Sequence, residues 1–419
     1  MRPSRHPILA FLILLISITP CAVPASGPET RSGSTVAPEN ERPQPLEVLP
    51  FELYDKRVWI SAKVNNKGPF DFQFDSAAGS SLLTPKAAVQ AGIEANAFAS
   101  ASGAGDATIQ VQVASDVSFR FGRISWAAQR IPLIPLDTID EGTGRRADGL
   151  IGKDFLDRFV FEIDYANRTM SVYDPSFKYT GGAGVSLPIT LAEGPIIEAL
   201  ISVPGRDPIR CRLLVDAPFT GSLTFARPFI EKNRLLDAAK ELTPKLLKTA
   251  LRGVGGESVM YMGRVQSLKV GPYSFEKPVA GFCLAEGGTL ARSDIDGLLG
   301  AEILRRFRVI FDFPHLRMIL EPAEGLTDAF ESDMSGLEIR SVAPELKTFT
   351  VRRVYEGTPA AEAGVRVGDS ITVINGWPVQ DFTLPEIRQI LRVPGREIRM
   401  RVLRGQEQKV VSFVLRRLI

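Results

Sequence analysis

Two aspartates at the ends of apolar runs are the residues best placed for catalysis in this 419-residue chain. The run 72–74 leads into Asp75, and the run 213–215 leads into Asp216. A duplicated strand that ends in an aspartate is one way to bring two carboxylates together at an internal twofold axis. Two carboxyl groups in one site cannot both ionise, so they share a proton and can activate water. The pattern predicts a hydrolytic carboxylate dyad; the alternative is a pair of turn-forming aspartates at strand ends.

Each aspartate is followed by an Asp-Gly-aliphatic-aliphatic-Gly segment, at residues 148–152 and 296–300. A glycine after an aliphatic run often only marks a bend. Here, however, the chain agrees with itself without gaps over residues 148–165 and 296–313, at polar and apolar positions alike, which indicates a real duplication. We expect the matched Arg and the second matched Asp to be structural. The matched pairs are Asp148/Asp296, Gly149/Gly297, Leu150/Leu298, Gly152/Gly300, Leu156/Leu304, Arg158/Arg306, Phe159/Phe307 and Asp164/Asp312.

Other catalytic chemistries lack the residues that they need. Of two histidines, only His315 lies beyond the N-terminal segment, beside Pro314 in an expected turn. The sequence has no Gly-x-Ser-x-Gly elbow, no His-Glu-x-x-His motif and no Cys/His cluster with metal-ligand spacing. It also has no phosphate-binding loop and no dinucleotide-binding glycine pattern. We therefore expect neither a metal nor a cofactor, and the carboxylates remain.

The segments that must position these carboxylates have sequence patterns typical of β-strands. Runs such as 58–64 and 109–113 predict strands, the second alternating so that one face is buried. Between them, Thr84 and Pro85 predict the start of a short helix that reaches Ala91 and ends at Gly92. A helix-like stretch around 229–236 occupies the equivalent place in the second copy. These patterns predict a mainly β protein.

Both copies resemble a lobe of the retropepsin-like aspartic proteases, over residues 51–175 and 195–322. The shared parts are the Asp loop, a Gly-containing flap, and an aliphatic-aliphatic-Gly segment that threads beneath the loop. The resemblance implies a bilobal pair of β-barrels, as in pepsin. It implies catalysis by Asp75 and Asp216, with Ser76 orienting Asp75. It implies active-site support from Ser76, Ala77, Gly152, Ala217, Pro218 and Gly300, and flaps containing Gly103, Gly105, Gly253, Gly255 and Gly256.

The two catalytic turns depart unequally from the family pattern Asp-Thr/Ser-Gly. Residues 75–77 (Asp-Ser-Ala) keep the hydroxyl, whereas residues 216–218 (Asp-Ala-Pro) lose both the hydroxyl and one backbone N–H. A buried carboxylate that lacks hydrogen-bond donors is disfavoured in its ionised form. We therefore expect either that Asp216 is the protonated partner or that the site is inactive.

Residues 335–417 resemble a PDZ domain. The resemblance rests on residues 357–364 (GTPAAEAG), 367–369 (VGD) and 374–376 (ING), with residues 336–339 at the place of the carboxylate-binding loop. It implies that a peptide C-terminus adds as a strand against the helix 384–391. The alternative is a PDZ fold that packs on the protease without binding a free terminus. The implied peptide-binding residues are Gly336, Leu337, Ile339, Leu384, Ile387 and Leu391.

The sequence predicts five segments. They are a signal peptide over 1–25, a Pro-rich linker over 26–50, lobe 1 over 51–175, lobe 2 over 176–325 and the PDZ domain over 335–417. The signal peptide implies an exported protein, periplasmic or secreted, without a stable membrane span after cleavage; an uncleaved anchor is the alternative. In an oxidising compartment Cys211 and Cys283 either form a disulfide or remain buried thiols.

These observations combine into one functional prediction. The formal net charge of +2 gives no reason to expect a nucleic-acid partner. We expect an exported aspartic-type endopeptidase, a monomer, whose partners are polypeptide substrates or C-terminal peptides. The competing interpretation is a catalytically inactive, protease-like module that binds peptides, and a lobe-exchanged dimer is a third possibility.

Overall fold

The computed structural model describes residues 43–128, 130–179 and 182–419. The predicted signal peptide and most of the predicted linker lie outside these residues. Within the described part of the chain, no helix is long and apolar enough to cross a membrane.

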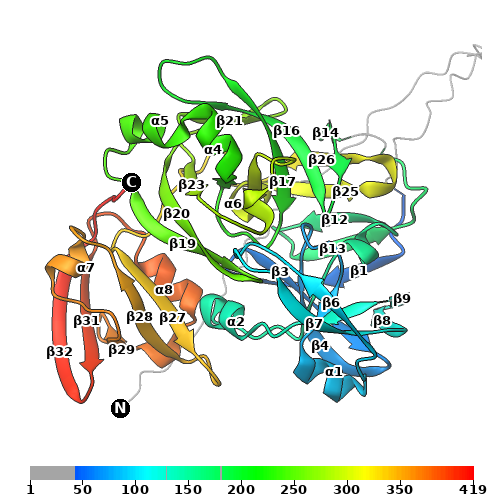
Figure 1. Cartoon of the computed structure of the whole chain (residues 1–419), viewed down its shortest axis with the longest axis horizontal. Helices are drawn as coiled ribbons and strands as arrows, with labels where there is room; N and C mark the ends of the chain where they lie inside the picture. The colour runs from blue at the N-terminus through cyan, green and yellow to red at the C-terminus, as the bar shows by residue number, and fades with distance from the viewer. Residues whose placement is uncertain (1–42, 129, 180–181) are drawn as a thin grey trace, which may run out of the picture. The chain divides into compact units, whose positions relative to one another are not determined.

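Lobe 1 is built on a ten-stranded sheet with the order β6-β7-β10-β5-β11-β4-β3-β8-β9, in which β2 pairs with β3 (Figure 1). Its strands are β2 (Glu52–Tyr54), β3 (Arg57–Val64), β4 (Lys67–Phe74), β5 (Leu82–Leu83), β6 (Ala97–Ala101), β7 (Ile109–Ala114), β8 (Val117–Phe121), β9 (Ile124–Ala128), β10 (Ile131–Leu133) and β11 (Gly149–Ile151). Its helices are α1 (Pro85–Ala91), α2 (Asp137–Thr143) and α3 (Lys153–Leu156).

Lobe 2 repeats this sheet strand for strand, with the order β19-β20-β23-β18-β24-β17-β16-β21-β22 and β15 paired with β16. Its strands are β15 (Thr190–Leu191), β16 (Pro195–Ser202), β17 (Ile209–Asp216), β18 (Leu223–Phe225), β19 (Leu247–Gly253), β20 (Gly256–Arg264), β21 (Ser267–Val270), β22 (Tyr273–Glu276), β23 (Val279–Cys283) and β24 (Gly297–Gly300). Its helices are α4 (Arg227–Asn233), α5 (Leu235–Leu242), α6 (Ala301–Leu304) and the short η1 (Thr289–Ala291) and η2 (Phe313–His315).

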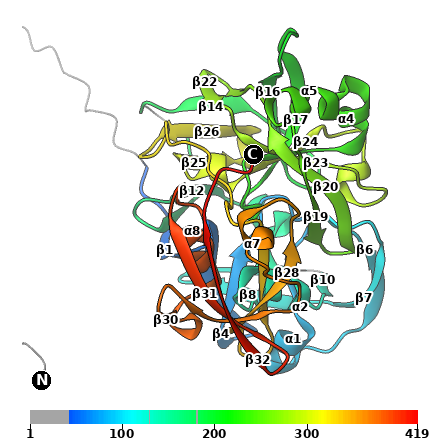
Figure 2. The ribbon, with the colours of Figure 1, turned by 90° about the vertical axis from the view of Figure 1, so that its left-hand side faces the viewer.

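A third, six-stranded sheet joins the lobes in the order β1-β13-β12-β25-β26-β14 (Figure 1, Figure 2). Its strands are β1 (Glu47–Pro50), β12 (Val160–Asp164), β13 (Thr169–Tyr173), β14 (Val185–Pro188), β25 (Phe307–Asp312) and β26 (Arg317–Pro322). The pseudo-twofold axis passes between β12 and β25, which pair antiparallel. The ring of Phe74, at the end of β4, lies 6.2 Å from that of Phe161 and 6.0 Å from that of Phe311. This packing fixes the end of β4, and the residue that follows it, over the central sheet.

The first of these central strands changes one predicted boundary. Residues 47–50 form β1 and pair with β13, although the sequence predicts a linker up to residue 50. Pro50 is compatible with this position because β1 lies at the edge of the sheet. The apolar side chain of Leu49 is 7% exposed, so the segment is part of the folded core.

Helix α1 follows the predicted signals. The Thr84 side chain accepts a hydrogen bond from the N–H of Ala87, Pro85 is the first helical residue, and Gly92 ends the helix with φ of 70°. The predicted second helical stretch is two helices, α4 and α5, separated by Arg234. Cys211 and Cys283 are both buried and free, so no disulfide joins them.

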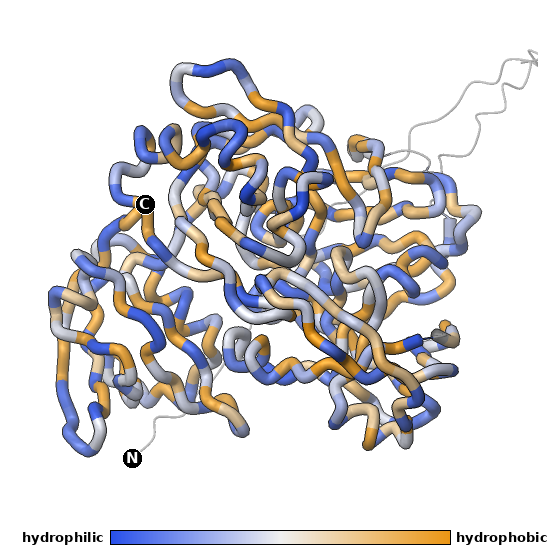
Figure 3. The backbone as a smooth tube through the Cα atoms, viewed as in Figure 1, coloured by the Kyte–Doolittle hydropathy of each residue, from blue (hydrophilic) through white to orange (hydrophobic). Residues whose placement is uncertain are grey.

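The C-terminal domain has its own sheet and its own apolar core. The sheet has the order β27-β28-β29-β31-β32, and β30 pairs with β29. Polar and apolar residues alternate along most of β31 (Figure 3), and its apolar residues Ile398, Met400 and Val402 are buried. The elements are β27 (Leu337–Val342), β28 (Thr348–Val354), α7 (Pro359–Glu362), β29 (Ser370–Ile374), β30 (Trp377–Pro378), η3 (Val379–Asp381), α8 (Leu384–Ile390), β31 (Glu397–Arg404) and β32 (Glu407–Val414).

Candidate active site

Each predicted catalytic aspartate lies at the end of the same strand in its lobe. Asp75 follows β4, and its N–H donates to the carbonyl of Ile151 at 2.9 Å. Asp216 is the last residue of β17, opposite Gly300 in the parallel register with β24. In both lobes the aspartate strand is therefore held by the Asp-Gly-aliphatic-aliphatic-Gly segment.

The geometry that these two segments share depends on their last glycine, because backbone that follows the aspartate lies directly against it. A Cβ atom on Gly152 would lie 2.6 Å from the carbonyl oxygen of Ser80. On Gly300 it would meet the carbonyl oxygens of Phe219 and Gly221. At both positions the carbonyl oxygens are closer than a Cβ atom tolerates. These glycines therefore permit a close approach of two backbone segments and do not only mark a bend.

The leading aspartates of these segments have a role that the sequence does not reveal. Asp148 accepts a hydrogen bond from the N–H of Asp71 at 2.9 Å, and Asp296 accepts one from the N–H of Arg212 at 2.8 Å. Each carboxylate thus fixes its segment to the strand that carries the candidate catalytic residue. The predicted structural pair Asp164 and Asp312 also accepts hydrogen bonds, from Arg308 and Arg317 respectively.

The two candidate catalytic carboxylates receive different numbers of amide donors. One Asp75 oxygen accepts from the N–H groups of Ala77 at 2.9 Å and Ala78 at 3.0 Å. Among the residues that the structure describes, Asp216 accepts only from the N–H of Phe219, at 3.0 Å, because Pro218 has no N–H to offer. The ionised form is therefore better stabilised at Asp75 than at Asp216.

Ser76 connects the two aspartate turns across the lobe interface. Its hydroxyl donates to the carbonyl of Val215 at 2.6 Å and accepts from the N–H of Ala217 at 3.0 Å. The serine is fully buried. It therefore holds the opposite turn, whereas the sequence predicts that it orients Asp75. Ala217 cannot return this pair of bonds, so the link is one-sided.

Burial dominates the electrostatics of the site. Burial raises the pKa of Asp75, and the two amide donors lower it in part. Burial also raises the pKa of Asp216, and the negative charge of Asp75 raises it further. Repulsion between two carboxylates acts on both of them, so the difference between the two comes from the missing amide, which leaves the ionised form of Asp216 less stabilised.

The predicted flap glycines lie at the place where the two flaps meet. Gly253 and Gly256 close the β19–β20 hairpin, and the lobe 1 loop that contains Gly103 and Gly105 packs against this hairpin. The N–H of Gly105 donates to the carbonyl of Val254 at 3.0 Å. A Cβ on Gly103 would lie 2.9 Å from that of Val254, which explains why the contact requires small residues.

A second set of contacts fastens the flaps through Asp106, which the sequence does not single out. One of its carboxylate oxygens accepts hydrogen bonds from the Ser258 hydroxyl at 2.7 Å and from the N–H of Glu286 at 3.0 Å. The N–H of Ala107 donates to the carbonyl of Gly255 at 3.0 Å. The flaps are therefore closed on each other in this structure.

Two segments of the chain match models of known protein families. Residues 60–155 match the family model described as aspartyl protease, and residues 350–404 match the PDZ domain model. The first match contains Asp75 and Gly152. The chain joins a retropepsin-like aspartyl protease fold to a PDZ domain. The mainly β architecture expected from the sequence is confirmed.

Similarity to individual proteins is more limited. Tax1-binding protein 3 from Homo sapiens and from Mus musculus is 39% identical over 67 residues, which are 16% of this chain and 54% of each relative. The chain thus spans about half the length of these curated relatives. The crystal structure of an aspartic proteinase from Irpex lacteus aligns with a TM-score of 0.42 and 13% identity, covering 67% of this chain and 98% of that one.

The predicted peptide-binding residues of the PDZ domain are mostly core residues. Leu384 and Ile387 are fully buried on α8, and Leu391 is 1% exposed. Leu337 and Ile339 of β27 are also buried, yet together with Leu391 they line a cavity of about 290 Å³. Gly336 precedes β27 with φ of 79°, and a Cβ there would clash with Thr358.

This cavity extends from the PDZ domain to the Asp216 turn. Its other wall includes Phe219 and Thr220 of that turn, and Lys56 of the β2–β3 turn. Lys56 donates to the carbonyl of Thr220 at 3.1 Å and forms an ion pair with Glu302. The sequence gives no signal for these contacts, because they involve a backbone carbonyl and residues that are remote along the chain.

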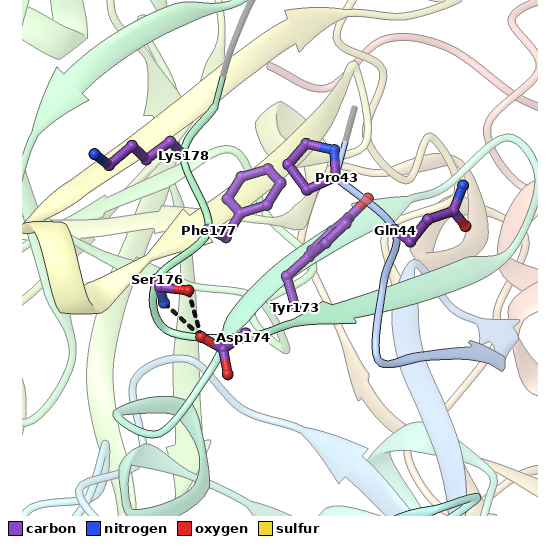
Figure 4. A pocket seen from close by; sticks show the side chains of 7 residues that line it. All are labelled: Pro43, Gln44, Tyr173, Asp174, Ser176, Phe177 and Lys178. Atoms are coloured by element: carbon purple, nitrogen blue, oxygen red, sulfur yellow. Dashed lines mark hydrogen bonds between the residues drawn. The ribbon is translucent and has the colours of Figure 1, made fainter. Parts of the chain in front are cut away.

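Another pocket lies away from both aspartates, at the end of β13 (Figure 4). The rings of Tyr173 and Phe177 are 4.3 Å apart in it, and the N–H and hydroxyl of Ser176 donate to Asp174. None of the predicted site residues lines this pocket. Among the described residues, no cluster of His, Cys, Asp and Glu is arranged to hold a metal ion.

Proposed function

We propose that this chain is an exported aspartic-type endopeptidase in which Asp75 and Asp216 activate water. The observation that carries the proposal is the pairing of the two aspartate turns across Ser76, whose hydroxyl bonds to Val215 and Ala217 of the other lobe. The aspartyl protease family match over residues 60–155, which contains Asp75, supports the part of the assignment that concerns lobe 1.

The unequal environments of the carboxylates give each a role in the reaction. Asp75, with two amide donors, is the ionised base that takes a proton from water as the water oxygen attacks the scissile carbonyl carbon. Asp216 holds the proton and donates it toward the carbonyl oxygen. Collapse of the resulting diol then returns a proton to Asp216, while Asp75 passes its proton to the leaving amine.

The flaps serve such a reaction by covering an extended peptide and excluding bulk water. Because they are closed on each other here, a substrate enters only after the contacts around Asp106 and Val254 have opened. The PDZ domain adds a surface suited to polypeptide recognition.

Cleavage of a quenched fluorescent peptide library, followed by mass spectrometry, tests this proposal. We expect activity in the wild type and a loss of at least a hundredfold in Asp75→Asn and in Asp216→Asn. Asp207→Asn, an exposed residue of lobe 2, is the matched control and should keep full activity. Equal cleavage by the wild type and Asp75→Asn would refute the dyad.

A non-catalytic peptide-binding module is the second candidate. The observations that favour it are the missing hydroxyl and amide at residues 216–218 and the closed flaps. It predicts that library peptides bind to wild type and Asp75→Asn alike and are recovered intact. The same mass-spectrometric experiment therefore separates the two functions.

A further inference from the structure

The peptide groove of the PDZ domain is bounded by β27 and α8. β27 is an edge strand of its sheet, and α8 packs beside it. An exposed edge strand next to a helix is where PDZ domains accept an extended peptide as an added strand. In this chain, α2 of lobe 1 contacts β27 at this place (Figure 1).

The contact is made by the end of α2 and the residues after it, which we call the α2 turn (residues 141–144). Arg388 of α8 donates to the carbonyl of Gly142 at 2.7 Å, and Arg340 of β27 pairs with Glu141 at 3.0 Å. A Cβ on Gly144 would lie 2.8 Å from the Cβ of Leu384. The same atom would lie 3.1 Å from the hydroxyl of Ser341 on β27. The α2 turn thus touches both walls of the groove at once.

The backbone N–H groups at the carboxylate-binding end of the groove also have an acceptor within the chain. One oxygen of Asp333 accepts hydrogen bonds from the N–H of Ser335 at 2.9 Å and the N–H of Gly336 at 2.7 Å. Backbone N–H groups of this kind are the donors that capture a peptide's terminal carboxylate. Here the carboxylate of Asp333 accepts their hydrogen bonds.

From these contacts we propose that the PDZ groove holds an internal ligand, the α2 turn, and that a polypeptide C-terminus enters only by displacing it. The proposal goes beyond peptide cleavage and holds whether or not the dyad turns over. It assigns the PDZ domain a regulatory contact with lobe 1.

Displacement of the α2 turn would affect both aspartate turns. α2 leads into β11, whose continuation, Gly152, packs under the Asp75 turn. Arg388 also pairs with Asp55 at 3.0 Å, and the next residue, Lys56, holds the carbonyl of Thr220 in the Asp216 turn. The PDZ helix is therefore one ion pair and one hydrogen bond away from that turn.

Peptide binding by the full chain in an Asp75→Asn background, which prevents cleavage, tests the proposal. The probe is a fluorescein-labelled decapeptide with a C-terminal valine and a free carboxylate. We expect weak binding to the parent and at least threefold tighter binding to Arg340→Glu, which places two negative charges together. Glu141→Arg combined with Arg340→Glu restores the ion pair and should restore weak binding. Arg399→Glu, an exposed change of the same charge on β31, should match the parent.

Hydrogen exchange supplies an independent measurement. Saturating probe should accelerate exchange of the amides of residues 139–146 in the parent protein. Equal affinity of the parent and Arg340→Glu, no binding by any variant, or probe binding that leaves exchange in α2 unchanged would each overturn the proposal. Circular dichroism confirms that each variant is folded before it is compared.

Discussion

Ser76 of lobe 1 donates its hydroxyl to the carbonyl of Val215 of lobe 2 at a distance of 2.6 Å. The same oxygen accepts the N–H of Ala217. A single buried hydroxyl therefore satisfies two backbone groups of the opposite aspartate turn. Nothing on residue 217 returns the interaction, so this side-chain link between the two aspartate turns is made from lobe 1 alone.

Ser76→Ala should uncouple the two turns. It leaves a buried carbonyl and a buried N–H without partners, which costs about 1–3 kcal/mol for each such group. We expect a lower free energy of unfolding in urea and a drop in kcat larger than any change in KM, because positioning is lost. Ser76→Thr keeps the hydroxyl and is the control; a loss in Ser76→Thr equal to that in Ser76→Ala would contradict this role.

Pro218→Gly should change the pH dependence of activity. The new N–H can donate to Asp216 and stabilise its ionised form, so the pKa of Asp216 falls. Since catalysis requires this group protonated, the alkaline limb of the pH profile should move to lower pH by about one unit, as one hydrogen bond to a charged group implies. Pro218→Ala, which also supplies the N–H, should move it in the same direction. An unchanged limb in both variants would argue against Asp216 as the acid.

Gly300→Ala should destabilise lobe 2. The added methyl meets the carbonyl oxygens of Phe219 and Gly221, and this overpacking should cost about 3 kcal/mol. The control is Gly142→Ala, because a Cβ there has no neighbour within 4 Å. Urea unfolding measures both variants. Equal stability of Gly300→Ala and the wild type would show that the glycine is dispensable.

The burial of Asp75 and Asp216 should make folding stability depend on pH. Both aspartates have a pKa above the ordinary value in the folded state, so the unfolded chain releases their protons first as pH rises. Their contribution is thus full below about pH 4 and declines as pH rises toward the folded-state pKa values. We expect Asp216→Asn to raise Tm at pH 8 and to leave it nearly unchanged at pH 4.

The exposed substitution Asp207→Asn is the reference for this measurement and should shift Tm little at either pH. An increase in Tm of Asp216→Asn that is the same at pH 4 and pH 8 would mean that ionisation of the site is not its cause.

The sequence predicts the features that occur in both copies of the duplicated unit. Asp75 and Asp216 end equivalent strands, and Gly152 and Gly300 pack under the turns, because both depend on residue type at fixed spacing. The effect of Pro218 is also predictable, since a missing N–H is a property of the residue itself.

The features that the sequence does not predict depend on tertiary contacts. β1 is four residues long with one buried side chain, so no local periodicity distinguishes it from a linker. Asp106 and Lys56 act on backbone groups of distant segments, which carry no side-chain signature. The contact of the α2 turn with Arg388 joins lobe 1 to the PDZ domain, so the sequence of neither domain alone predicts it.

The pairing of β12 with β25 has a consequence for how such a molecule can be built. Each lobe supplies three consecutive strands of the central sheet, and the innermost strand of each pairs with its counterpart. A half-chain that ended after β13 would carry an open β12 edge, and an open edge recruits another strand. Two identical half-chains joined there would reproduce the interface. The central sheet is therefore of a kind that two separate subunits can form as well as one chain, by pairing of one exposed strand with its counterpart.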